Sequence, residues 1–455
     1  MRPGRLLILA LVVLGFGAFI YFFERQKPTT DELAERKDKL FADLDQEKAR
    51  RIVIDNSHGH FELVKEAGEW RLTAPIADNA NQGAVSSLLS TLRTLKAERT
   101  LPAAGLKLAD YGLDKPQLTA SVEDESGKTF ALRLGNELPL GNSRALTTGG
   151  GDVYVVSKYI ATDVERDLAG WRSDQLVQVY SSDVASVSIA SPAGRVALAN
   201  TSGVWTITEP FADLADRDRA EGLISDLNAA RIKEFIDAPG DLAALGLAKP
   251  ALEVNLVRKD KPPVKLEFGA EREKDGAKQT ACRRGERVFW VDDNARTRAV
   301  ATVVEWRSSS LVRLDTWAAE KLELVAGAAK AALERKDGVW KAGDVEVDGD
   351  AVSRRLNTLA DLKVTAFDRP KPGGEPKGTV KVTVRDGAVV EVSFFQAAGA
   401  GEATAVVPGR SGAFAVDGAR VGEILSDPAA LTRPKPTPTP QPTVGATPTP
   451  EAPEE

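Results

Sequence analysis

The chain has 455 residues, of which 42% are hydrophobic and 28% charged, so it carries enough apolar material for several ordinary hydrophobic cores. Its formal net charge of −6 argues against a nucleic-acid-binding role, because phosphate backbones select basic surfaces. Cys282 is the only cysteine, which excludes a disulfide within the chain and means that packing alone must hold each core.

The N-terminus carries a hydrophobic segment, residues 6–23, an unbroken run of 18 apolar or small residues. At 1.5 Å per residue a helix of this length spans about 27 Å, close to the ~30 Å hydrocarbon core of a bilayer. Arg2 and Arg5 precede it, so we expect residues 1–5 in the cytoplasm, a single-pass anchor in the inner membrane and a periplasmic body. A cleaved signal peptide is the alternative, but residues 19–23 are Phe-Ile-Tyr-Phe-Phe, where a cleavage site needs small residues.

A highly charged segment, residues 24–40, follows the anchor. From Asp31 to Arg51 both signs of charge are dense, with a few apolar residues between them: Leu33, Leu40, Phe41 and Leu44. We interpret it as a solvated stalk, helical or extended, between the membrane and the first folded unit.

The tryptophan spacing predicts an internal repeat. Three tryptophans lie 135 residues apart, and each follows a glycine by two positions: Gly68 and Trp70, Gly203 and Trp205, Gly338 and Trp340. Such a period is too long for a solenoid and suits a small domain. We therefore predict three copies of one unit, at residues 41–173, 174–308 and 309–432.

Longer strings repeat in the first two copies. The string Gly-x-Trp-x-x-Thr-x-Pro-x-Ala-Asp starts at Gly68 and at Gly203, and it contains Pro75 and Pro210. Gly-Leu-x-Lys-Pro occurs at residues 112–116 and 246–250, and Trp-Arg-Ser closes the copies at Trp171 and Trp306. The third copy has neither of the last two strings, so we expect a diverged terminal copy.

The first copy predicts strands, a helix, more strands and a short helix, in that order. Period-two alternation predicts strands at residues 51–55, 61–65 and 69–73, joined by turns at 58–60 and 67–68. Helical spacing of Val85, Leu88, Leu89, Leu92 and Leu95 follows, with Asn79 or Asn81 as the cap. Further strands are expected at 118–122, 129–134 and 152–156, and a short helix through Val164 and Leu168 to Trp171.

The corresponding helix recurs at the same offsets in the second copy and three residues early, from Val352, in the third. The predicted fold class is therefore α+β: three tandem domains, each a mainly antiparallel sheet with helices, after one N-terminal transmembrane helix. A tryptophan beside a turn glycine is typical of a hairpin packed onto its core, whereas ligand stacking would need an exposed ring.

Candidate chemical sites are few. His58 and His60 are the only histidines, and with Asp55 and Glu62 they could form a metal site, although a solvated turn fits the pattern better. Cys282 precedes Arg283 and Arg284, which could lower the pKa of its thiol, but no partner pattern accompanies it. Residues 127–129, Gly-Lys-Thr, lack the first glycine of a phosphate loop and predict a hairpin turn.

Asp78 and Asp213 occupy matching positions before the helix, which suits a turn or a cap better than an acid catalyst. No catalytic, cofactor-binding or metal-binding residue is predicted, and we expect a protein that is not an enzyme and takes no cofactor.

The tail, residues 433–455, has proline at alternate positions, which blocks helix and sheet pairing and favours polyproline II. A disordered spacer is the simpler interpretation. The alternative is a docking peptide or wall-spanning arm that contacts other envelope proteins.

The anchor, the tryptophan hairpins, the Gly-Leu-x-x-Pro string and the Trp-Arg-Ser closure together resemble the bacterial DUF4340 family, over most of residues 40–310. The resemblance implies association with an ABC transporter of the gliding-motility auxiliary type, which has an ATPase, a permease and an exported subunit. It implies no enzymatic activity and transfers no functional residue; a link to motility or pilus assembly is an association only.

Three functional hypotheses follow. The first is a non-enzymatic, membrane-anchored periplasmic scaffold that contacts the transporter permease and ATPase. The second is an exported protein that binds a glycan or a peptide and presents it to the transporter. The third is a hydrolase whose site assembles between copies from scattered carboxylates.

Overall fold

The computed structural model describes residues 38–434, apart from 103, 140, 150 and 396–400. The predicted anchor, most of the predicted stalk and the tail from residue 435 lie outside the described residues. No helix among the described residues is long and apolar enough to cross a membrane. The chain divides into two compact units between Gln175 and Leu176.

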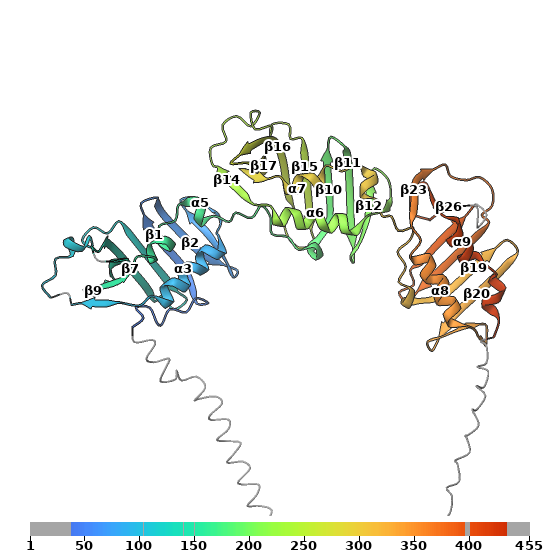
Figure 1. Ribbon diagram of the computed structural model, residues 1–455, viewed down its shortest axis with the longest axis horizontal. Coiled ribbons are helices and arrows are strands. Elements are labelled where there is room, and N and C mark those ends of the chain that lie inside the picture. Colours follow the sequence, from blue (N-terminus) through green and yellow to red (C-terminus); the bar gives the residue numbers. More distant parts are fainter. Residues whose placement is uncertain (1–37, 103, 140, 150, 396–400, 435–455) are drawn as a thin grey trace, which may run out of the picture. The chain divides into compact units, whose positions relative to one another are not determined.

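The described residues form three nine-stranded sheets in which every pairing is antiparallel, one sheet in the first unit and two in the second (Figure 1). This confirms the prediction of three repeated domains with mainly antiparallel sheets. Each sheet buries one face under helices and has a hydrophobic core of its own.

The first copy contains β1 (Ala49–Asn56), β2 (Gly59–Glu66), β3 (Glu69–Ala74), β4 (Asp78–Asn79), α3 (Gln82–Thr94), β5 (Arg99–Leu101), β6 (Leu118–Asp124), β7 (Thr129–Glu137), β8 (Ser143–Thr147), β9 (Val153–Ser157), α4 (Ile160–Val164) and α5 (Leu168–Trp171). The second contains β10 (Val184–Ser191), β11 (Gly194–Thr201), β12 (Val204–Glu209), β13 (Asp213–Leu214), α6 (Arg217–Ala229), β14 (Ile232–Ile236), β15 (Leu252–Arg258), β16 (Val264–Lys274), β17 (Ala277–Arg284), β18 (Arg287–Asp292) and α7 (Asn294–Ala299). The third contains β19 (Ala319–Ala326), β20 (Ala329–Lys336), β21 (Val339–Ala342), β22 (Val345–Glu346), α8 (Gly349–Ala360), β23 (Val364–Arg369), β24 (Gly378–Val384), β25 (Val389–Phe394), β26 (Glu402–Val406), β27 (Ala413–Asp417) and α9 (Gly418–Leu425).

The strand order of the first sheet is β4-β3-β2-β1-β6-β7-β8-β9-β5, and the other two sheets repeat it. Four strands run from the centre to one edge as a meander. The main helix then crosses the sheet, so that the next strand, β5, pairs at the opposite edge beside β9. The helix α3 thus lies between the two edges, and its apolar residues pack into the core of the sheet (Figure 1).

The main helices begin and pack as their sequences predict. Asn81, Asp216 and Asp348 cap α3, α6 and α8, each accepting a hydrogen bond from a backbone N–H of the first turn. The apolar stripe of each helix is buried, and the cap of α8 lies three residues early in the period, as expected.

The repeated glycine–tryptophan pair lies at a two-residue hairpin turn. Gly68, Gly203 and Gly338 have φ angles of 88°, 81° and 80°, and the residue before each also has a positive φ. This left-handed pair fits the twist of an antiparallel hairpin and favours glycine at the second position. The tryptophan two residues later is buried in all three copies, so no ring face is exposed for ligand stacking: Trp70, Trp205 and Trp340.

Two local predictions are wrong. The end of the predicted stalk belongs to the first domain: Leu40 N–H donates to the carbonyl of Leu95 at 2.9 Å, and Phe41 and Leu44 are buried in the core. The single short helix before Trp171 is two helices, α4 and α5. The Asn56 amide donates to two carbonyls at the break, at 2.8 and 2.9 Å, and so stabilises it.

The Gly-Leu-x-Lys-Pro loops explain a glycine in the neighbouring strand. A Cβ on Gly135 would lie 2.0 Å from the carbonyl oxygen of Tyr111, and one on Gly269 would lie 2.1 Å from that of Leu245. Only glycine lets the loop backbone lie directly on the strand.

Candidate functional site

The Trp-Arg-Ser segments close the first two copies onto their main helices. Trp171 and Trp306 are fully buried, and the carbonyl of each accepts the backbone N–H of the helix cap residue, at 2.9 Å from Asn81 and 2.8 Å from Asp216. The serine N–H then pairs with the edge strand before the helix. The repeated segment therefore adds a backbone pairing at the N-terminus of each main helix.

The arginine of this segment forms a buried ion pair with the repeated aspartate. Arg172 Nε donates to Asp78 Oδ2 at 2.8 Å, and Arg307 Nε donates to Asp213 Oδ2. Their side chains are almost completely buried. The turn-or-cap interpretation of the two aspartates is therefore wrong as regards the cap, which is the residue three positions later in each copy.

The third copy replaces both partners together. Val347 pairs with Pro434 where Ala80 and Ala215 pair with the two arginines, so Pro434 occupies the arginine position. Val345, the first residue of β22, occupies the aspartate position. Both charges of the pair are therefore absent from the third copy, where the two positions are exposed.

The segment between the second and third copies makes backbone hydrogen bonds to both of them. Ser308 N–H donates to Leu214 O of the second copy at 2.8 Å, and the next residues pair with the third. Leu311 N–H donates to Leu362 O at 2.9 Å, and Val364 N–H donates to Ser309 O at 2.7 Å. A further backbone bond joins the two copies directly, from Ser411 N–H to Ala212 O at 2.8 Å.

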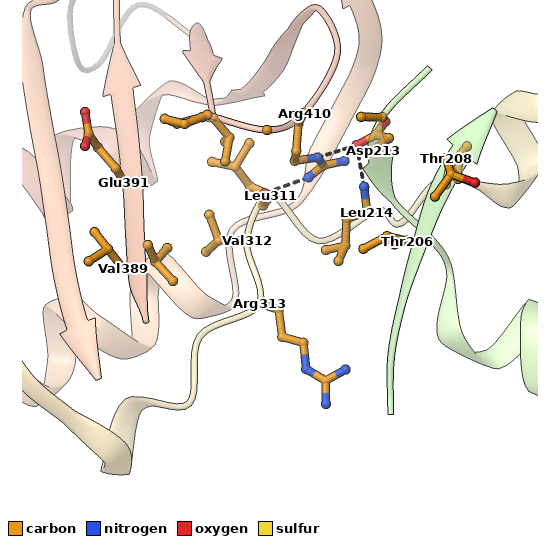
Figure 2. A pocket seen from close by; sticks show the side chains of 16 residues that line it. Thr206, Thr208, Asp213, Leu214, Leu311, Val312, Arg313, Val389, Glu391 and Arg410 are labelled. Carbon is orange, nitrogen blue, oxygen red and sulfur yellow. Dashed lines mark hydrogen bonds and ion pairs between the residues drawn. The ribbon is translucent and has the colours of Figure 1, made fainter. Parts of the chain in front are cut away.

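Side chains of the third copy complete the ion pair of the second (Figure 2). Arg410 Nε donates to Asp213 Oδ1 at 2.5 Å, and its Nη1 donates to the carbonyls of Ser310 and Leu311 at 2.8 and 2.6 Å. Arg307 Nη1 donates to Asp368 Oδ1 at 2.6 Å. We call Asp213, Arg307, Asp368 and Arg410 the join cluster.

Aromatic rings enclose the join cluster. The Arg307 guanidinium lies 4.3 Å from the ring centre of Phe367 and 5.0 Å from that of Phe211, and Arg410 lies 4.3 Å from that of Phe414. Burial lowers the pKa of Arg410, while the charge of Asp213 opposes the shift. Both carboxylate oxygens of Asp213 accept hydrogen bonds from guanidinium groups, so the cluster is suited to holding the two copies together rather than to proton transfer.

A groove of about 750 Å³ opens beside the join cluster, between the second and third copies (Figure 2). Its lining is mostly valine, leucine, isoleucine and threonine, and none of the described lining residues is aromatic. Two strand edges border it. β13 covers β12 only at Thr206 and Ile207, and β26 covers β25 only at Ser393 and Phe394, which leaves the exposed Val389 at the mouth.

The other predicted residues are not among those that line the groove. His60 is exposed at the start of β2, and its Nδ1 lies 2.7 Å from Oδ1 of Asp55 on β1. The described residues contain no cluster of three or more metal-ligating side chains. Cys282 is fully buried, and burial raises the pKa of its thiol even though Arg284 opposes the shift. Gly127 and Lys128 lie in the turn between β6 and β7, as predicted, whereas Thr129 is the first residue of β7. Pro75 and Pro210 follow cis peptide bonds.

Comparison with protein families gives one match, repeated along the chain. The model of a domain of unknown function, DUF4340, matches residues 70–238 and 205–381, which together exceed half of the chain. The chain belongs to the DUF4340 family. Each match starts at a hairpin tryptophan, Trp70 or Trp205, so the DUF4340 model repeats with the period of the fold. A search of curated proteins found no match.

Sequence reasoning missed the join cluster, although part of its signal was present. Asp78 and Arg172 have the same separation, 94 residues, as Asp213 and Arg307. That equal spacing could have predicted the pair in both DUF4340 repeats. Arg410 occurs only in the third copy, and nothing periodic marks it.

Proposed function

We propose that the protein is a non-enzymatic, membrane-anchored periplasmic scaffold subunit of an ABC-transporter-linked envelope machine, with a motility or pilus role among its associations. The join cluster supports this proposal most directly, because it makes two copies of one fold into a single body. A fixed spacing between repeated surfaces is what a scaffold requires.

The sequence and the family contribute the rest of the proposal. Residues 6–23 are long and apolar enough to anchor the chain, and the basic N-terminus favours a periplasmic body. The transporter partners rest on the DUF4340 resemblance. The charged side chains of Asp213 and Arg307 are fully buried and engaged with each other, which favours a structural role for them.

Affinity purification of the tagged full-length protein from cross-linked membranes tests the proposal. We expect a permease and an ATPase to co-purify, and we expect Asp213→Asn to reduce their recovery because it loosens the join. Glu402→Gln, which removes only an exposed ion pair with Arg369, serves as the matched control. Recovery of neither transporter subunit with the wild-type protein would contradict the proposal.

The groove favours a second candidate function, binding of an extended peptide by strand addition. Exposed edges of β12 and β25 offer backbone partners, and apolar side chains such as Val312 and Val389 line the groove beside them. The strand edges and the non-aromatic lining favour a peptide over a glycan.

Panning a displayed library of random decapeptides against the full-length protein tests this second candidate. We expect peptides with apolar residues at alternate positions, whose binding is lost in Val389→Asp at the groove mouth. Val257→Asp changes another exposed strand valine and should leave binding intact. Enrichment of peptides that bind Val389→Asp equally well would refute a groove site.

A further inference from the structure

The main helix of each copy packs against a later helix: α3 against α4, α6 against α7 and α8 against α9. The residues at this contact, which we call the seam, differ among the three copies. In the first copy, a carboxylate of α4 fills it. Asp163 accepts hydrogen bonds from Ser87 at 2.9 Å, Thr91 at 2.6 Å and Arg166 at 2.8 Å. The charge is thus fully satisfied within the copy.

The second copy has an ion pair in the same seam, with the carboxylate on the main helix instead of the later helix. Here Asp226 of α6 takes the position of Thr91, and Arg298 of α7 takes the position of Asp163, each 135 residues later. Arg298 Nε donates to Asp226 Oδ2 at 2.6 Å. Gly222, at the position of Ser87, leaves room for the guanidinium, because a Cβ there would lie 2.9 Å from Arg298 Cζ.

In the third copy no carboxylate stands at the positions matching Asp163 and Asp226, and arginines line the seam. The buried stripes of α6 and α8 match at an offset of 132 residues, which places Arg354 and Thr358 at the positions of Gly222 and Asp226. Arg355 falls where the other copies have fully buried leucines, Leu88 and Leu223. Arg420 of α9 faces them, just before the buried Val421, as Asp163 precedes Val164 and Arg298 precedes Ala299.

An open polar cleft of about 550 Å³ lies between α8 and α9, and the three arginines line it. Arg355 Nη2 donates to Ser426 O at 2.7 Å and Ser426 Oγ at 3.2 Å. Arg354 has one long ion pair, 3.9 Å to Asp348, and its side chain is 71% exposed. Among the described residues, Arg420 makes no ion pair. Two carboxylates, Asp361 and Glu423, also line the cleft, yet neither is within ion-pair distance of a cation there.

The hydroxyl in the seam also differs. Thr91 donates to Asp163 in the first copy, whereas Thr358 donates back to the carbonyl of Arg354 at 3.0 Å. Burial lowers the pKa of Arg355, and the neighbouring charge of Arg354 lowers it further, against the opposing charge of Asp427. A negative group entering the cleft would relieve the repulsion between the arginines.

We propose that the cleft between α8 and α9 is a binding site for a carboxylate-bearing ligand, which takes the place that a carboxylate of the chain itself fills in the other two copies. Arg355 and Arg420 supply planar groups that can bind a carboxylate through two hydrogen bonds each. Thr358 supplies a hydroxyl that can turn towards it, as Thr91 does. The ligand is a free polycarboxylate or an acidic segment of a polypeptide.

Calorimetric titration of the full-length protein with citrate and, separately, with a tetraglutamate peptide tests the site. We expect saturable binding of at least one probe below about 10 mM, weakened at least tenfold in Arg355→Gln and in Arg420→Gln. Arg385→Gln removes an exposed arginine of β24's neighbouring turn and should change nothing. Binding of citrate alone would identify a small ligand, and binding of tetraglutamate alone would identify an acidic peptide, both as the proposal requires.

A second variant keeps the test decisive if a neutral substitution damages the fold. Arg420→Asp rebuilds the arrangement of the first copy, so we expect it to abolish binding while the melting temperature stays equal or rises. Binding of neither probe, inorganic phosphate binding as tightly as both probes, or unchanged affinity in Arg420→Asp would each overturn the proposal.

Discussion

Replacing Asp213 with asparagine is the sharpest perturbation of the join cluster. The asparagine has nearly the same volume, but it removes the only negative charge that both buried guanidinium groups share. The side-chain NH₂ of the asparagine would then face the N–H of Arg307 or Arg410, and two donors cannot form a hydrogen bond. Arg307 and Arg410 then remain buried with less negative charge to balance them.

The expected cost follows from the burial of the pair. Removing one partner of a buried ion pair typically costs about 3–5 kcal/mol, because the remaining charge stays uncompensated. Arg307 keeps Asp368, and Arg410 keeps the carbonyls of Ser310 and Leu311, so we expect the lower end, about 3 kcal/mol. At about 1.4 kcal/mol per factor of ten, the opening equilibrium of the join should rise roughly a hundredfold.

Hydrogen–deuterium exchange of the full-length protein measures this opening at the residues concerned. The amide of Ser411 donates to Ala212 O across the join, and the amides of Ser308 and Leu311 lie in the segment that connects the two copies. We expect these amides to exchange about a hundredfold faster in Asp213→Asn. The control Glu402→Gln loses an ion pair that is 49% exposed and should change them by less than about fivefold. Exchange of these amides within threefold of wild type in Asp213→Asn would refute the reasoning.

Three further predictions concern other parts of the fold. Gly269→Ala should destabilise the second unit by about 1–3 kcal/mol in urea titration, because its Cβ would meet Leu245 O at 2.1 Å; unchanged stability would show that the loop yields freely. Cys282 should react with a thiol reagent at pH 7 only after unfolding, since burial raises its pKa; rapid labelling of the folded protein would contradict this. Burial raises the pKa of Asp163, but bonds from Thr91, Arg166 and Ser87 outweigh that effect, so its folded pKa lies below its unfolded value. The stabilisation from Asp163 is therefore present above about pH 4 and is lost as the pH falls through the folded pKa. In Asp163→Asn the melting temperature should fall less steeply with decreasing pH than in wild type. An equally steep fall in the variant would argue against this.

The repeated fold could be predicted from the sequence because its signals are local. Period-two alternation predicted β1, β2 and β3, and the helical spacing of Val85 to Leu92 predicted α3, since each pattern reports one buried face. The glycine–tryptophan hairpins were predictable because the two-residue turn constrains both positions.

Elements that depend on long-range pairing could not be predicted in this way. The edge strands β4 and β5 have two and three residues, too few to show a period, and they exist because α3 carries the chain from one edge to the other. The join cluster unites residues up to 197 positions apart, Asp213 and Arg410, so no local pattern reports it. The cleft between α8 and α9 could not be predicted either, because its lining residues come from two helices about 65 positions apart.

A distance measurement between the second and third copies tests the central claim most directly. Spin labels on Thr201→Cys and Lys330→Cys, both exposed strand positions, can be compared by double electron–electron resonance in the full-length protein, since the native Cys282 is buried. The join cluster predicts one narrow distance distribution that broadens in Asp213→Asn. A broad distribution in the otherwise wild-type protein would contradict a fixed body, and with it the proposed scaffold.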